Sequence, residues 1–141
     1  GEGDLGARMG HVTDALLALF DAALLLGADS PQLQTSDLAA AVAALASHQH
    51  VIGPSEDGGF WLFATRGHVP ATAWSATPWS RPDTAARFLD ALGNPPVAHL
   101  RCLRDVDTVE DLPPLLAALD ALTDPLPEQQ QLAQWLHDQK I

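Results

Sequence analysis

The feature that most constrains the fold is a short apolar run over residues 22–26, which is followed by the sequence Gly-Ala-Asp-Ser-Pro. An apolar run of this length, bounded by glycine and proline, is typical of a strand that is buried on both faces in a parallel sheet flanked by helices. Ligands of open α/β sheets bind beyond the carboxyl ends of the strands, and Asp29 would lie there. Asp29 is therefore either a metal or substrate ligand or the start of the next turn.

Size and charge narrow the class of protein. The chain has 141 residues, of which 47% are hydrophobic, so it is long enough for one domain with a substantial core. Its formal net charge of -11 would repel phosphate-rich polymers, which argues against a nucleic-acid partner. Acidic sites for divalent cations remain compatible with this charge, because a bound cation reverses the local sign.

The single cysteine, Cys102, excludes an intramolecular disulfide and a cysteine-based zinc cluster, and it is consistent with a reducing compartment. It falls in a predicted strand over residues 97–103, where we expect a buried, inert thiol. No apolar stretch reaches the roughly 20 residues that a membrane span requires, and the start of the chain has no signal-peptide pattern. We therefore expect a cytoplasmic protein.

Helical periodicity and capping residues outline the remaining elements. Residues 4–20 are predicted to form a helix that Asp4 caps, after a loop at residues 1–3. Its apolar stripe should comprise Leu5, Met9, Val12, Leu16, Leu19 and Phe20. Further helices are predicted over residues 38–46, 80–92, from about residue 108, and over 128–139, with strands over 50–53, 60–65 and 97–103. Residues 66–80 should be irregular.

Several polar or aromatic residues have both a functional and a structural interpretation. Arg8 could hold an anion, but it could also be solvated or paired with Asp4. Gly58 and Gly59 would let a ligand approach the backbone, although the residues alone favour an Asp-Gly turn between two strands. Trp79 could line a pocket or cover the edge of the core.

A second group of carboxylates follows the last predicted strand. Asp105 and Asp107 alternate on an extended segment, so both side chains can face one side. Hard divalent cations prefer such oxygen ligands. Helix capping by Asp107 or Thr108, with Glu110 or Asp111 at the capping-box position, explains the same pattern more simply.

Taken together, five segments resemble a known family, the bacterial glycosyltransferase-A-like proteins described as radical-SAM/selenodomain-associated transferases of unknown substrate. These proteins are related to the molybdenum-cofactor and phospholactate guanylyltransferases. The matching segments are, in order, Gly3–Met9, Gly27–Leu33, Gly53–Leu62, Pro78–Ser80 and Arg104–Leu112. Their order over residues 3–112 makes the match specific, although each segment alone is weak.

The resemblance implies an α/β, three-layer nucleotide-diphospho-sugar transferase fold (GT-A, Rossmann-like). In this superfamily, an aspartate at a strand end and a second acidic residue late in the chain hold Mg²⁺ or Mn²⁺ on the phosphates of a nucleotide-linked donor. Asp29 corresponds to the first, and Asp107, or next Asp105, to the second. The Asp57-Gly58-Gly59 loop would lie on the acceptor side. On this basis we assign Asp57 as the catalytic residue and assign substrate binding to Arg8, Ser30, Gly58, Gly59 and Trp79.

The resemblance also implies that this is the carboxyl-terminal portion of such a domain, lacking the N-terminal strands and the basic, glycine-rich loop that binds the nucleotide. We expect a partial transferase domain over residues 1–123, followed by a linker and a helix over 124–141. Two functions remain open. One is metal-dependent glycosyl or nucleotidyl transfer, and the other is a non-catalytic domain that acts by self-association or partner binding. An uncovered sheet edge would favour a homodimer.

Overall fold

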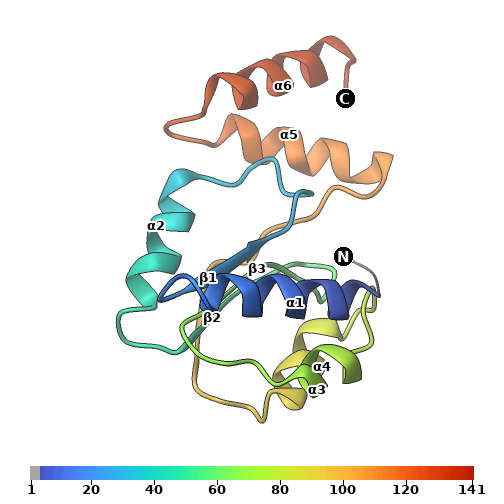
Figure 1. Cartoon of the computed structure of the whole chain (residues 1–141). Helices are drawn as coiled ribbons and strands as arrows, with labels where there is room; N and C mark the ends of the chain where they lie inside the picture. The colour runs from blue at the N-terminus through green and yellow to red at the C-terminus, as the bar shows by residue number, and fades with distance from the viewer. Residues whose placement is uncertain (1–3) are drawn as a thin grey trace.

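A computed structural model describes residues 4–141 as a sheet with helices on both faces and a helical hairpin beyond it (Figure 1). The loop predicted at residues 1–3 lies outside the described residues. The strands are β1 (Ala23–Leu26), β2 (His50–Pro54), β3 (Phe60–Thr65) and β4 (Val97–His99). The helices are α1 (Leu5–Leu17), α2 (Thr35–Ala44), α3 (Ala71–Ala76), α4 (Thr84–Ala91), η1 (Val109–Asp111, a 3₁₀ turn), α5 (Leu112–Asp120) and α6 (Pro127–Asp138).

The sheet is mixed, with the strand order β1-β3-β2-β4. β3 runs antiparallel to both of its neighbours, whereas β4 is parallel to β2. The short connection between β2 and β3 makes a hairpin, and the parallel β2–β4 pair requires a crossover, which α3 and α4 supply. The carboxyl ends of β1, β2 and β4 therefore lie at one end of the sheet, beside the start of β3.

Two apolar clusters on opposite faces of the sheet make the three layers (Figure 1). On one face α2 packs on the sheet through Ala41 and Leu45. On the other face α1, α3 and α4 enclose an aromatic cluster around Phe63, Trp74 and Phe88. In that cluster the Phe63 and Phe88 rings meet edge to face, with centroids 5.0 Å apart. The predicted three-layer α/β class is thereby confirmed.

β1 departs from the predicted strand in one respect. Its two faces are covered as expected, since Leu24 packs toward α2 and Leu25 toward the aromatic cluster. In the part of the chain that the structure describes, however, β1 pairs with β3 alone, and the pairing is antiparallel. β1 is thus an edge strand rather than an interior strand of a parallel sheet. Apolar composition reports covered faces, and it carries no information about a neighbouring strand.

α1 is capped by Asp4, as predicted, and its carboxylate accepts the N–H of Ala7 at 2.8 Å. The buried side of α1 is nevertheless not the predicted apolar stripe. It consists of Gly6, Gly10 and Thr13, because the bulky Trp74 and Trp79 lie against it and leave no room for large side chains. Val12 of the predicted stripe is 46% exposed, and Leu19 and Phe20, at 78% and 62%, lie beyond the helix, which ends at Leu17 rather than at residue 20.

α5 and α6 pack on each other around a third apolar cluster, which comprises Leu115, Leu116, Leu119 and Leu136. The predicted boundary between residues 123 and 124 therefore lies in the turn between two helices that share a core. The hairpin is joined to the strand-end loops by Gln129, whose amide donates to the carbonyls of Pro31 and Leu33 at 2.8 and 2.7 Å.

Three local predictions differ from the structure. The segment 66–80 contains α3, which is only six residues long and is stabilised by burial of Ala73 and Trp74 rather than by a capping motif. β4 ends at His99, so the predicted strand over 97–103 is too long. Cys102 is exposed rather than buried, although loss of hydration and the nearby Glu56 raise the pKa of its thiol.

No helix among residues 4–141 is long and apolar enough to cross a membrane.

Candidate active site

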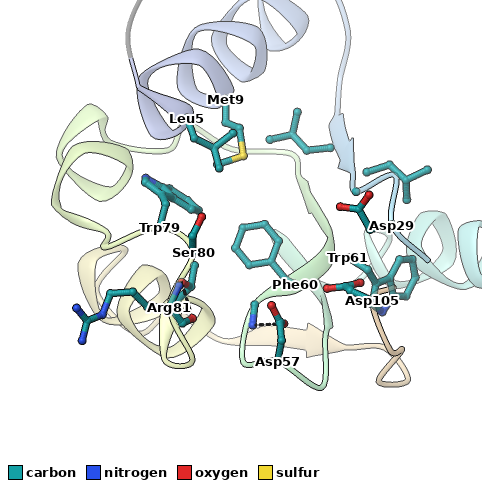
Figure 2. A pocket seen from close by; sticks show the side chains of 15 residues that line it. Leu5, Met9, Asp29, Asp57, Phe60, Trp61, Trp79, Ser80, Arg81 and Asp105 are labelled. Atoms are coloured by element: carbon teal, nitrogen blue, oxygen red, sulfur yellow. Dashed lines mark hydrogen bonds between the residues drawn. The ribbon is translucent and has the colours of Figure 1, made fainter. Parts of the chain in front are cut away.

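A cavity of about 450 Å³ opens at the carboxyl end of β1 (Figure 2). Among residues 4–141, three carboxylates line it, those of Asp29, Asp57 and Asp105. The rest of its lining comes from Leu5, Met9, Leu25, Leu26, Gly27, Gly59, Phe60, Trp61, Trp79, Ser80, Arg81 and Thr84. This is the position that the chain's strand-end aspartate predicts, because ligands of α/β sheets bind beyond the carboxyl ends of the strands.

Two hydrogen bonds bring the distant acidic segments together. The N–H of Val106 donates to the main-chain carbonyl of Asp29 at 2.8 Å, so the segment after β4 runs beside the segment after β1. One residue further along, the buried Ser30 hydroxyl donates to Oδ1 of Asp105 at 2.7 Å. Asp29 and Asp105 therefore face one cavity although 76 positions separate them in the sequence.

Asp107 lies beside these carboxylates but is not among the residues that line the cavity. Loss of hydration raises the pKa of its carboxyl, and the negative charges of Asp105, Asp29 and Asp57 raise it further. The cap that the sequence predicts here is made by Thr108 and Asp111. Oδ2 of Asp111 accepts the main-chain N–H groups of Asp107 and Thr108 at 3.2 and 3.0 Å.

The fit of these residues to a metal ion depends on what a ligand adds. Within residues 4–141, no three histidine, cysteine or acidic side chains are close enough together to hold an ion by themselves. Asp29 and Asp105 offer two carboxylates at one cavity. Mg²⁺ is commonly held by one or two carboxylates, with substrate phosphates and water completing its shell. The donor set therefore fits an ion that is shared with a phosphorylated ligand.

The predicted glycine loop forms the lower border of the cavity in Figure 2. Oδ1 of Asp57 accepts the N–H of Gly59 at 2.8 Å, which holds that carboxylate at the rim. Gly58 has φ +88°, and a Cβ there would collide with the carbonyl oxygen of Pro82. Gly58 thus has a structural role in the turn and in the contact with Pro82, whereas Gly59 lines the cavity, and ligand binding by either glycine stays a prediction.

The loop before α4 forms the wall that faces Asp29 and Asp105 across the cavity (Figure 2). The Trp79 indole N–H donates to the carbonyl of Trp74 at 3.0 Å, and the two ring systems stack with centroids 6.1 Å apart. Ser80, at φ 58°, reverses the chain, and the buried hydroxyl of Thr84 binds both main-chain groups of Arg81. Trp79 is thus a pocket residue as well as a packing residue.

Arg8 is exposed on the first turns of α1 and does not line the cavity. The neighbours that do line it, Leu5 and Met9, were predicted as core residues, since an apolar position on a helix gives no signal of a ligand. Phe60 and Thr84 were likewise not predicted as site residues. The adjacent glycines at 58 and 59 are the one sequence signal that marks this end of β3.

Arg104 joins the two loops that carry the carboxylates. Its guanidinium pairs with Glu56 in the β2–β3 hairpin and with Asp111 at 3.2 Å. The main chain repeats this connection, since the N–H of Glu56 donates to the carbonyl of Leu103 at 2.9 Å. Asp57 is therefore held near Asp105, because the residues directly before them, Glu56 and Arg104, pair with each other.

This fold, with carboxylates at the end of β1, is that of a nucleotide-diphospho-sugar-transferase-like domain. A crystal structure from Desulfovibrio desulfuricans G20, designated a candidate nucleotide-diphospho-sugar transferase, matches 99% of this chain with a TM-score of 0.84 and 25% sequence identity. The match covers 63% of that protein, so this chain spans less than two thirds of its length. The comparison with curated proteins returns no match.

The chain belongs to the family described as "Uncharacterized protein conserved in bacteria (DUF2064)", whose model matches residues 1–81. The matched region contains β1, the Asp29 segment and the Asp57-Gly58-Gly59 loop. It ends beside Trp79 and Ser80, so it includes most of the cavity wall but not Asp105 or Asp107.

Proposed function

We propose that this chain forms the acidic side of the active site of a glycosyl- or nucleotidyltransferase that uses a nucleotide-linked donor. The observation that carries the proposal is the convergence of Asp29 and Asp105 on one cavity at the carboxyl end of β1. The likeness to the Desulfovibrio protein supports the same class of reaction. The single cysteine, Cys102, is consistent with a cytoplasmic setting.

Asp29 and Asp105 would hold Mg²⁺ or Mn²⁺, and Asp107 would add to the negative potential that attracts the ion. Ser30 supports this role, because its hydroxyl fixes one oxygen of Asp105 and leaves the other to bind. The ion would supply Lewis-acid stabilisation of the leaving phosphate. Without a cation, three carboxylates around one cavity would repel a diphosphate.

Asp57 is proposed as the general base at the rim of the cavity. In glycosyl transfer, it would take the proton of an acceptor hydroxyl while the acceptor oxygen bonds to the sugar carbon. The bond from that carbon to the donor phosphate breaks, and the nucleoside diphosphate leaves with the electron pair. In nucleotidyl transfer the acceptor would attack the α-phosphorus, and pyrophosphate would leave. Gly59 favours close approach of the acceptor, and Arg8 stays a candidate for anion binding.

A second candidate function is association without catalysis, which the edge position of β1 favours. In the described part of the chain its outer edge has no strand partner, and it lies beside exposed apolar side chains. These include Leu5 at 47%, Val12 at 46% and Leu26 at 46% exposed. Such an edge is a template for pairing with another strand. We therefore propose a homodimer in which this edge is covered.

Calorimetry with MnCl₂ and a panel of nucleoside diphosphates and triphosphates tests the transferase proposal. We expect metal-dependent binding of at least one nucleotide and none in the presence of EDTA. Failure of this chain to bind, together with failure of a version that includes the upstream coding sequence, would contradict the proposal. Binding that is independent of metal would retain the nucleotide site but remove the assigned role of Asp29.

A further inference from the structure

The cavity has two chemically different sides (Figure 2). The carboxylates of Asp29 and Asp105 lie together at one side, and that of Asp57 lies at the lower rim. The opposite wall is apolar and is assembled from separate elements. Its members are Leu5 and Met9 from α1, Leu25 from β1, Phe60 from β3 and Trp79 from the loop before α4.

The apolar wall is fixed before any ligand arrives. Phe60 meets Trp79 edge on, with ring centroids 6.1 Å apart, and it also packs on Phe88 at 5.6 Å. Trp79 is held by its hydrogen bond to Trp74, and the Thr84 hydroxyl binds the main chain of Pro78 and Arg81 on either side of it. A ligand that uses this wall therefore spends little free energy on ordering side chains.

The charges at the cavity determine which polar group a ligand can carry. In the part of the chain that the structure describes, the one cationic lining residue is Arg81, whose guanidinium extends away from the cavity in Figure 2 and lies 3.6 Å from Asp83. The carboxylates of Asp57 and Asp105 each accept one hydrogen bond from the protein and keep lone pairs for a ligand. A hydroxyl or ammonium group would be bound there, whereas an anionic group would be repelled unless a cation lay between.

We propose that the cavity binds the acceptor of the transfer reaction, and that this acceptor is an alcohol or amine on an apolar body. The apolar body would lie against Met9, Phe60 and Trp79, with the hydroxyl or amine directed toward Asp57. A polyhydroxylated sugar would leave this wall poorly covered, and an anionic acceptor would face the carboxylates. The role as acceptor rests on the proposed transferase function, whereas the preference for this chemical class rests on the cavity alone.

Met9 is the single methionine of the chain and lines the cavity, so it provides a direct reporter. Methyl-¹³C-methionine labelling gives one resonance, which a bound aromatic ring will shift. The probes are 2-phenylethanol, 2-phenylethylamine, 3-phenylpropionate and glucose, each titrated without metal or nucleotide. We expect saturable shifts with the alcohol and the amine, and binding at least about tenfold weaker for the carboxylate and for glucose.

A pair of variants assigns the binding to the apolar wall. Leu5→Ser removes an apolar group from the cavity at a half-exposed position that tolerates the change, and we expect about fivefold weaker binding of 2-phenylethanol. Val42→Ser is the control, because Val42 is 64% exposed on α2, across the sheet. Equal binding of all four probes, or tighter binding of glucose, would overturn the proposal. Unchanged affinity in Leu5→Ser with an unchanged melting temperature would do the same.

The same titrations separate this inference from the transferase proposal. If the probes bind and no nucleotide does, the proposed chemical class of the ligand is supported and the proposed transfer reaction is contradicted. If a nucleotide binds with metal while none of the probes shifts the Met9 methyl resonance, the proposed acceptor class is contradicted and the proposed donor site is supported.

Discussion

The main-chain N–H of Val106 donates to the carbonyl oxygen of Asp29 at 2.8 Å, and this bond places two strand-end loops side by side. The side chain of Val106 packs on the α5–α6 cluster, so the bond is anchored in a second core. Because each loop carries a carboxylate, their contact creates the acidic side of the cavity. Neither loop would form such a site alone.

Asp29→Ala should abolish metal-dependent nucleotide binding and leave the fold intact. The side chain of Asp29 is exposed at the cavity, so its loss removes a ligand and leaves no buried gap. Calorimetry with MnCl₂ and nucleotide measures the effect, and circular dichroism verifies the fold. Asp21→Ala is the matched control, since Asp21 is an exposed carboxylate outside the cavity. Equal affinity in the two variants would refute the role of Asp29.

Asp107→Asn should stabilise the metal-free protein at neutral pH. The pKa of Asp107 is raised in the folded state by loss of hydration and by neighbouring carboxylates, so its negative charge opposes folding. The gain in stability should therefore be present above the folded-state pKa of Asp107. It should vanish below the ordinary aspartate pKa, where the carboxyl is protonated in both the folded and the unfolded protein. Urea midpoints of the variant and the wild type across this pH range test the sign. A gain that persisted at low pH would contradict an electrostatic origin.

Asp37→Asn should cost roughly 1–2 kcal/mol of unfolding free energy at neutral pH. Arg101 donates two hydrogen bonds of 2.6 Å to this nearly buried carboxylate, and they lower its pKa. Its contribution is therefore present above the ordinary aspartate pKa and lost as pH falls through the lowered folded value. Arg87→Gln, which breaks an exposed pair on α4, should shift the urea midpoint much less. Equal shifts would show that burial adds nothing.

Gly58→Ala should destabilise the protein more than Gly93→Ala, although both glycines have φ near +90°. Alanine at Gly93 meets no atom within 4 Å, so its cost is the backbone strain of about 1–2 kcal/mol. Alanine at Gly58 would also push against the carbonyl of Pro82, which should add roughly 1–3 kcal/mol. Chemical denaturation gives the free energy of unfolding of the two variants, and the difference between them is the steric cost at Gly58. Equal losses of stability would mean that the loop moves away from Pro82 without cost.

Light scattering should show a dimer that Leu26→Lys converts to monomer. A lysine at this exposed edge position would place a charge in the proposed β1 interface. Val109→Lys makes the same change of charge at a residue that is 68% exposed in η1, outside the sheet, so it should stay dimeric. A wild-type chain that is monomeric at every concentration would exclude the homodimer.

The sequence predicts the sheet faces and most helices well, because apolar runs and caps act locally. β3 begins and ends where the glycines before it and its apolar run place it, and Asp4 caps α1 as expected. The buried face of α1 could not be predicted, since Gly6 and Gly10 owe their burial to Trp74 and Trp79, more than 60 positions away. The resemblance predicts an uncovered sheet edge, but the sequence does not identify β1 as that edge, because pairing is a property of the sheet.

In the candidate site too, the residues with a local sequence signal could be predicted and those that depend on long-range contacts could not. Asp29, Asp57 and Asp105 stand out because carboxylates and glycines follow strands, and the structure brings all three to one cavity. Leu5, Met9 and Phe60 have the character of core residues in the sequence, and their role depends on which side of each element is left open. Ser30 reaches Asp105 through a contact between distant loops that no local pattern encodes.

The helical hairpin of α5 and α6 has a consequence for motion at the site. It holds its own apolar core, and it reaches the strand-end loops through Gln129 and Val106. A unit with a separate core can open locally while the sheet stays folded. Each such opening would release the anchors at Asp29 and in the segment that follows it, and would widen the spacing of the carboxylates. Amide exchange at Val106 would then follow the opening of the hairpin, so that the last helices of the chain set how long the acidic cluster stays assembled.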